Sequence, residues 1–224
     1  MSLPPITSCQ EITVTVIMAR KHAKRQLGGF AVGTLAWFLC SISMGLPHWR
    51  VWFFQDPMES KPGMILVGMW RTCVYHQESN SSFNRVCYKY TYQDTFIPLD
   101  IRVAQHLLLI ASSLGIAATI SVIVALWKLY SGRLRKKATF NPFRLPGILN
   151  IIASSFVFLS TLYNYLSIFR KDGIAFPPSF RTPSFPDSQK VGTALVMATI
   201  SCFLFLVGGI IPLSFTLPPR YRVR

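Results

Sequence analysis

Hydrophobic residues in this chain gather into four long blocks that are separated by polar segments. None of the blocks carries a charge near its centre. Each has about 20 residues or more, which at 1.5 Å per residue is enough to cross a bilayer core of about 30 Å. The pattern therefore predicts four membrane-spanning helices, at residues 27–46, 103–127, 145–169 and 191–217.

The composition agrees with a membrane protein. Of the 224 residues, 51% are hydrophobic, and the mean hydropathy is +0.39. A soluble domain of this size would distribute its apolar residues periodically instead of concentrating them in four blocks.

The chain is strongly basic, with a formal net charge of +15. Such a charge is typical of nucleic-acid-binding proteins when it forms a basic face on a soluble domain. Here the basic residues cluster before the first block, between the second and third, and after the fourth. This placement indicates contact with membrane lipids, and we expect no nucleic-acid partner.

The same charges predict how the chain crosses the membrane. Residues 128–144 contain six basic residues and no acidic one, whereas residues 47–102 contain six basic and five acidic residues. Because segments rich in lysine and arginine stay in the cytoplasm, both termini are expected there. Residues 47–102 and 170–190 then form two outer loops of a plasma-membrane protein.

The expected organisation has three parts. Residues 1–26 form a cytoplasmic N-terminal extension, residues 27–217 the four-span domain, and residues 218–224 a short basic cytoplasmic tail. The extension contains an apolar run, 12–19, that is too short to span a membrane. We expect the extension to be disordered. An alternative is that translation starts at Met18.

The first outer loop has the pattern of a small antiparallel sheet. Strand-forming runs cover 51–54, 64–75 and 86–92, and a turn-rich cluster separates the last two. Cys73 and Cys87 lie on either side of this cluster. A disulfide between them would join the two runs on an oxidising, extracellular face, with a loop-closure stabilisation of roughly 3 kcal/mol.

Several other residues of this loop have candidate roles. Gly68 within a strand-like run indicates a bulge or a close backbone approach. Trp49 and Trp70 suit the membrane boundary as members of an aromatic belt, although their spacing to the cysteines favours a more specific role. Asn80 begins the sequence Asn-Ser-Ser, an acceptor for N-glycosylation.

The second outer loop contains four prolines among several phenylalanines. Because proline cannot donate to a strand ladder, this loop is expected to be extended and not part of a sheet. Phe176, Phe180 and Phe185 would either form a lid on the first loop or contact another molecule.

The motifs of catalysis and of metal binding do not occur. The four histidines lack metal-ligand spacing with one another or with the cysteines. There is no phosphate-binding glycine loop, nucleophile elbow or HExxH sequence. We therefore expect neither an enzyme, nor a cofactor, nor a bound metal.

The outer-loop residues resemble the signature of the claudin family, within the PMP22/EMP/claudin superfamily. The resemblance covers residues 27–217 and rests on Gly45-Leu46-Pro47-His48-Trp49-Arg50, on Gly68-Met69-Trp70, on Cys73 with Cys87, and on Arg102 at the start of the second span. It implies a membrane α-helical fold in which a left-handed bundle of four transmembrane helices carries a small extracellular antiparallel β-sheet. It also implies a structural and adhesive role at tight junctions, as part of a paracellular barrier or permeability path, with other claudin-like chains as partners in cis and in trans.

The chain departs from the family pattern in two places. The terminal Arg224 does not fit the hydrophobic pocket of a PDZ domain, so PDZ scaffold binding is not expected. The cysteines that claudins often carry beside the second and fourth spans for palmitoylation are also missing. An alternative is a PMP22-like or channel-regulatory four-span protein that organises membranes without forming junction strands.

The resemblance also identifies a candidate ion-path residue. In pore-forming claudins, charge just after the second cysteine helps to select ions, and Lys89 occupies that region here. A fixed positive charge in a narrow path disfavours cations. We expect that any pore of this protein is not selective for cations.

Overall fold

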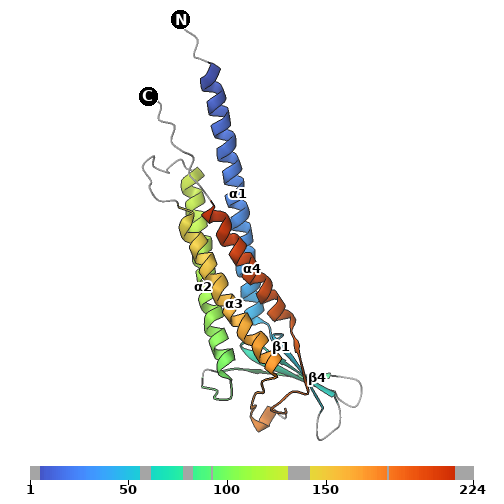
Figure 1. Ribbon diagram of the computed structural model, residues 1–224. Coiled ribbons are helices and arrows are strands. Elements are labelled where there is room, and N and C mark those ends of the chain that lie inside the picture. Colours follow the sequence, from blue (N-terminus) through green and yellow to red (C-terminus); the bar gives the residue numbers. More distant parts are fainter. Residues whose placement is uncertain are drawn as a thin grey trace.

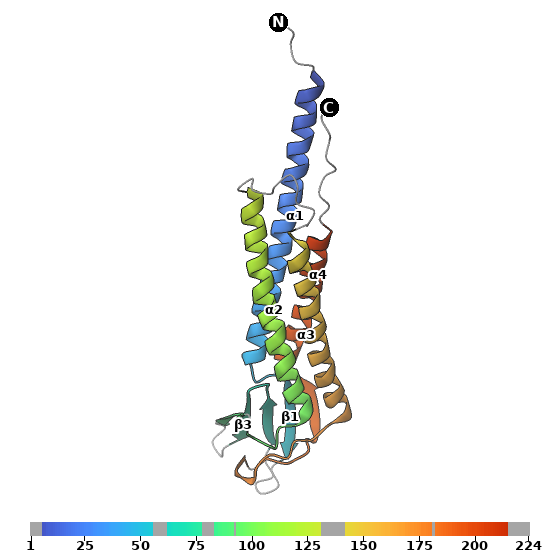
Figure 2. The same ribbon diagram turned by 90° about the vertical axis from the view of Figure 1, so that its left-hand side faces the viewer.

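The computed structural model describes residues 6–55, 62–77, 83–91, 93–130, 142–180 and 182–214. The structure contains a bundle of four helices and a five-stranded sheet. The sheet lies at one end of the long bundle, as Figures 1 and 2 show from two sides. The helices are α1 (Ile6–Gly45), α2 (Leu99–Tyr130), α3 (Arg144–Arg170) and α4 (Thr193–Leu213). We call the end of the bundle that carries the sheet the sheet end.

All four helices contain stretches long and apolar enough to cross a membrane. These stretches are Lys24–Gly45, Leu99–Lys128, Arg144–Arg170 and Thr193–Leu213. They overlap the four predicted spans, and the four-helix architecture with a small antiparallel sheet is confirmed. The start of α1 and the end of α4 both lie away from the sheet end (Figure 1).

The N-terminal region differs from the prediction. Residues 6–26 were expected to be disordered, but α1 begins at Ile6 and continues without interruption to Gly45. At 1.5 Å per residue its 40 residues are about 60 Å long, roughly twice the thickness of the bilayer core. The start of α1 therefore extends well beyond the other helices, as both views show (Figures 1 and 2).

The helices meet through small residues and polar side chains. An added Cβ on Gly209 of α4 would lie 2.8 Å from the carbonyl oxygen of Gly147 on α3, so these backbones are in contact. Asn150 Nδ2 donates to the Gly208 carbonyl at 3.4 Å, and Ser201 Oγ donates to the Ala36 carbonyl at 2.8 Å. In a bilayer such contacts replace the hydrophobic effect as the force that joins helices.

The sheet is antiparallel throughout, in the order β4-β3-β2-β1-β5. Its strands are β1 (Arg50–Gln55), β2 (Pro62–Val67), β3 (Arg71–Gln77), β4 (Phe83–Lys89) and β5 (Ser188–Val191). The first four strands come from the first outer loop. β5 comes from the second loop and pairs with β1, with Arg50 opposite Val191.

Two details of the predicted sheet were wrong. The run 64–75 is not one strand, because the chain turns at residues 68–70 and separates β2 from β3. The second loop was expected to stay outside the sheet, yet its last residues form β5. The four prolines all precede this strand, so residues 188–191 keep the backbone N–H groups that pairing requires.

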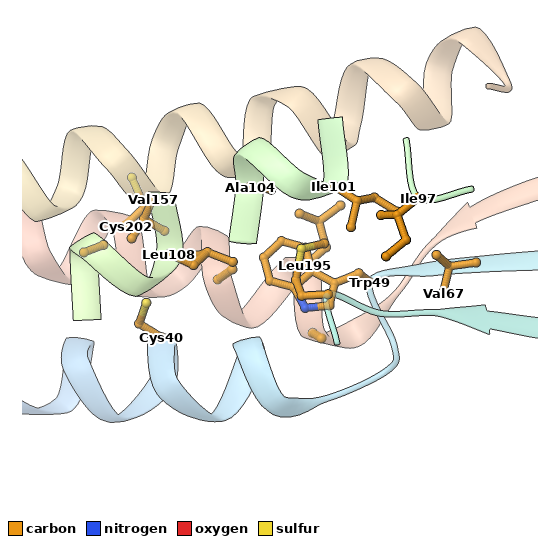
Figure 3. Packing of buried hydrophobic residues seen from close by; sticks show 14 of the residues in the cluster. Cys40, Trp49, Val67, Ile97, Ile101, Ala104, Leu108, Val157, Leu195 and Cys202 are labelled. Atoms are coloured by element: carbon orange, nitrogen blue, oxygen red, sulfur yellow. The ribbon is translucent and has the colours of Figure 1, made fainter. Parts of the chain in front are cut away.

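A single hydrophobic core continues from the bundle into the sheet. Figure 3 shows the indole of Trp49 beside Leu195, with Ile101 close by and Val67 on the adjoining strand. All four residues are at most 1% exposed. The sheet and the bundle therefore form one packed unit that shares this core.

We predict that Gly209→Ala destabilises the protein. The new methyl group would lie 2.7 Å from Ile151 Cγ1 and 2.8 Å from the Gly147 carbonyl oxygen, so α3 and α4 must separate. Overpacking of this kind costs about 1–3 kcal/mol. Thermal unfolding in detergent should show a lower midpoint. Gly28→Ala is the control because its methyl group meets nothing within 4 Å; equal midpoints for the two variants would contradict close packing at Gly209.

Candidate functional site

Arg50, the first residue of β1, is buried at the sheet end with 1% of its surface exposed. Its guanidinium forms an ion pair with Asp100 in the first turn of α2. It also donates from Nε to Asn164 Oδ1 at 3.0 Å and from Nη1 to Ser167 Oγ at 2.7 Å, both on α3. One side chain thus joins a strand to two helices.

The partners of Arg50 are themselves held in place. Asn164 Nδ2 donates to the Ser160 carbonyl at 2.9 Å, so its Oδ1 is left facing the guanidinium. Asp100 lies at a helix N-terminus, where a negative charge is favourable. These contacts offset the several kcal/mol that removing a guanidinium from water costs.

Trp49 lies beside Arg50 and is completely buried. Its Nε1 donates to the Ser43 carbonyl at 2.8 Å, which holds the turn between α1 and β1. Of the two interpretations of Trp49, a specific buried role fits this contact, whereas a member of an aromatic belt at the membrane boundary does not. Its own carbonyl accepts from the Gly192 amide at 3.0 Å, so the tryptophan also connects to the start of α4.

Gly68 makes the close backbone approach that its position in a strand-like run predicted. Its amide donates to the Arg71 carbonyl at 3.0 Å, closing the turn between β2 and β3. A Cβ there would lie 2.5 Å from Pro47 Cα. Only glycine fits, because the turn packs directly against the chain that leaves α1. Trp70 follows in the same turn and is partly buried against the core.

Cys73 and Cys87 form a disulfide across β3 and β4, in which they occupy directly paired positions. The bond joins the two strands named by the sequence analysis. Arg85 lies over it, with Nε 3.2 Å from Cys87 Sγ. Asn80, the candidate glycosylation site between these strands, lies outside the described residues.

Arg102 and Gln105 attach the first loop to α2. Arg102 donates from Nη2 to the Asp94 carbonyl, and Gln105 donates from Nε2 to the Met69 carbonyl. Arg102 therefore makes a contact with the loop and is not simply an arginine that reaches toward water.

The phenylalanines of the second loop divide into two groups. Phe180 stacks on Tyr88 of β4 with ring centroids 3.8 Å apart, and Phe176 meets Trp52 of β1 edge-on at 5.8 Å. These two rings form a lid on one face of the sheet, which we call the covered face. Phe185 is 71% exposed, so it remains the contact candidate among the three.

The opposite face of the sheet is basic. Strand register places Arg71 opposite Lys89, Tyr75 opposite Arg85, and Val51 opposite Lys190, all on the side that carries the disulfide. None of the residues in the five strands is acidic. We call the four residues Arg71, Arg85, Lys89 and Lys190 the basic face.

Within the part of the chain that the structure describes, no three His, Cys, Asp or Glu side chains are grouped so that they could hold a metal. Cys40 and Cys202 are free cysteines that lie buried in the helices.

Sequence reasoning included Arg50 in the family signature but missed its partners. Asn164 and Ser167 carried one usable signal, which is that polar residues on α3 recur at helical spacing. The buried polar positions Asn150, Ser154, Thr161 and Asn164 mark a continuous inward face of that helix. Such residues inside a membrane span face protein and not lipid.

Comparison with known families agrees with this geometry. The family model described as PMP-22/EMP/MP20/Claudin tight junction matches residues 34–214. This protein belongs to that family. The match covers the sheet-end part of the first spanning helix, the other three spanning helices and the whole sheet. It identifies a multi-pass membrane protein of a junctional and structural family, not of an enzyme family.

Relatives within the family are distant. Claudin-2 of Mus musculus is 27% identical over 199 residues, which cover 87% of this chain and 79% of the relative. Claudin-2 of Bos taurus is 26% identical over 198 residues, with the same coverage. Claudin-2 of Canis lupus familiaris is 27% identical over 197 residues, 86% of this chain and 78% of the relative. The chain is a divergent claudin-family member.

We predict that Arg50 and Asp100 are coupled energetically. Asp100→Asn leaves a buried guanidinium without its counter-charge, and breaking a buried pair costs about 3–5 kcal/mol. Thermal unfolding of Arg50→Met, Asp100→Asn and the double variant forms a double-mutant cycle. The double variant should be less destabilised than the sum of the single ones.

Asp172→Asn is the matched control for this cycle, because Asp172 is exposed and its hydrogen bonds to other described residues use only its backbone. It should unfold like the unmodified protein. Strict additivity of Arg50→Met and Asp100→Asn would show that the ion pair contributes nothing specific.

Proposed function

We propose that this protein is an adhesive and barrier component of tight junctions that assembles with claudin-like chains in cis and in trans. Both termini lie in the cytoplasm, so the sheet end faces the extracellular space. The observation that carries the proposal is the family match over residues 34–214 together with a sheet that is anchored rigidly to the bundle. A rigid outer surface suits contacts between cells because little freedom is lost on binding.

Exposed apolar residues at the sheet end support lateral assembly. Leu99 at the start of α2 is 76% exposed, Phe169 near the end of α3 is 87% exposed, and Phe185 is 71% exposed. Burying such a side chain against a neighbour contributes about 1.5–3 kcal/mol. Three of them near the membrane surface favour a protein that does not act alone.

The basic face supports a barrier to cations. Lys89 and Arg85 are exposed on it, and Lys190 lies above the ring of Phe53 at 5.2 Å. Asp187, next to β5, accepts a hydrogen bond from the Gln55 amide at 3.0 Å. The interaction energy between a unit charge and an ion about 8 Å away is about 2 kcal/mol at an effective dielectric constant of about 20. This energy is sufficient to repel cations from a narrow path.

Recruitment to cell contacts tests the assembly. In cells without junctions, the tagged protein should collect where two expressing cells meet and not where an expressing cell meets a non-expressing one. Phe185→Ser should weaken association about tenfold by removing one apolar contact. Ser184→Ala, an exposed change in the same loop, should have no effect. Uniform distribution over the membrane would instead support a PMP22-like organiser that forms no junction strands.

Dilution potentials across an epithelial monolayer test ion selectivity. The unmodified protein should confer no preference for sodium over chloride. Lys89→Glu should shift the potential toward sodium because it reverses the charge on the basic face. Arg170→Glu, an exposed change at the end of α3 and outside the sheet, is the control. A marked sodium preference of the unmodified protein would refute the proposed role of this face.

A further inference from the structure

A cavity of about 60 Å³ lies between the turn before β3, the segment after β4 and the first turns of α2. Trp70, Tyr90, Arg102 and His106 are among the residues that line it. Since one water needs about 10–15 Å³ of such space, the cavity has room for about four water-sized groups. None of the contacts that hold the sheet on the bundle requires a cavity at this place.

The cavity lies at the depth of lipid headgroups. The candidate span of α2 has 30 residues, which is about 45 Å of helix and exceeds the hydrocarbon core by about 15 Å. About five residues at each end of α2 therefore lie in the headgroup layer. Arg102 is the fourth residue of the helix and therefore lies in this layer, and Gln105 and His106 lie less than one turn beyond it.

Arg102 supplies a positive charge whose hydrogen-bonding capacity is only partly used. Its Nη2 donates to the Asp94 carbonyl, a neutral acceptor. The Asp94 carboxylate is engaged elsewhere, because its Oδ2 accepts from the Thr91 amide at 2.6 Å. Within the described ranges, Nε and Nη1 of Arg102 have no hydrogen-bond partner and the guanidinium has no ion pair. A guanidinium in this state can still donate a charge-assisted hydrogen bond to a phosphate group.

The aromatic walls of the cavity stay neutral. Tyr90 shares a hydrogen bond with Thr72, and burial raises the pKa of Tyr90 to about 12, with that hydrogen bond acting in the opposite direction. No negative charge from this phenol opposes an anion at neutral pH. Tryptophan and tyrosine also favour the membrane–water interface, where one part of the ligand is apolar and another is wet.

We propose that this cavity binds the phosphate of a phospholipid in the membrane leaflet at the sheet end. Arg102 donates a charge-assisted hydrogen bond to the phosphate, and Trp70 and Tyr90 enclose it from the side of the sheet. The acyl chains continue along the outer surface of α2, where Leu109, Ile110 and Ile116 are exposed. The bound lipid would fill the gap between the first loop and α2 and so support the turn that begins β3.

Lipid retention by the purified full-length protein tests this proposal. The protein in detergent is offered phosphatidylcholine or a diacylglycerol with the same acyl chains, and native mass spectrometry measures the bound fraction. We expect about tenfold stronger retention of phosphatidylcholine, the effect of one charge-assisted hydrogen-bonded pair. Equal retention of the two lipids would overturn the proposal, because it would show a site for acyl chains only.

Two variants change the cavity in different ways. Arg102→Gln removes the charge, and Thr91→Phe fills the space while leaving the backbone hydrogen bond of residue 91 to Asp94 available. Both should lower phosphatidylcholine retention to the level of diacylglycerol. Thr91→Phe keeps the test valid if Arg102→Gln fails to fold, and normal retention by Thr91→Phe would overturn the proposal.

Two further measurements separate the sources of binding. Arg170→Gln removes an exposed charge near the same end of the bundle and should retain the lipid normally; an equal loss there would show general attraction instead of a site. Millimolar inorganic phosphate should not displace phosphatidylcholine. Displacement would show a site for free phosphate and would refute a lipid site.

Discussion

Arg50 places a full positive charge in the protein interior, almost completely shielded from water. The arrangement of the sheet on the bundle satisfies this buried charge. A buried guanidinium is tolerated only where a counter-charge and further acceptors surround it. Asp100 supplies the charge from α2, while Asn164 and Ser167 supply acceptors from α3. Because Arg50 begins β1, satisfying this one side chain fixes the first strand against two helices. Every other strand is then placed by pairing, directly or through a neighbour, with β1.

The bundle below this junction obeys a different physical rule. Lipid tails are as apolar as leucine, so burying hydrophobic surface adds little to helix association, and close packing with internal hydrogen bonds takes its place. The contact of Gly209 with Gly147 and the bonds made by Asn150 and Ser201 fulfil that role. The sheet is therefore held by the buried ion pair of Arg50, and the helices are held together by close packing and internal hydrogen bonds. The two parts nevertheless share one hydrophobic core at Trp49.

The two faces of the sheet have different roles. One face is covered by Phe176 and Phe180 from the second loop, which packs as a lid. The other face carries only basic charges, and exposed apolar side chains lie around the base of the sheet. This separation supports a protein that presents a fixed charged surface while it joins neighbours near the membrane. The same rigid geometry leaves a cavity at headgroup depth, where the surrounding lipid becomes part of the structure.

Properties that depend on composition over a long stretch could be predicted from the sequence alone. The four spans follow from the length of the apolar blocks, and the paired cysteines follow from their place on either side of a turn. Contacts between distant segments could not be predicted, because a strand or a polar residue does not specify its partner. The residues of β5 were expected to form a loop, and they are a strand because they pair with β1. The sequence left the role of Trp49 open between an aromatic belt and a more specific position, and its contacts with Ser43 and the start of α4 decide between them. The partners of Arg50 likewise became identifiable only from the folded structure, in which the ends of α2 and α3 meet. Whether a charge is shielded from water, and by which residues, depends on the three-dimensional arrangement and not on the position in the sequence.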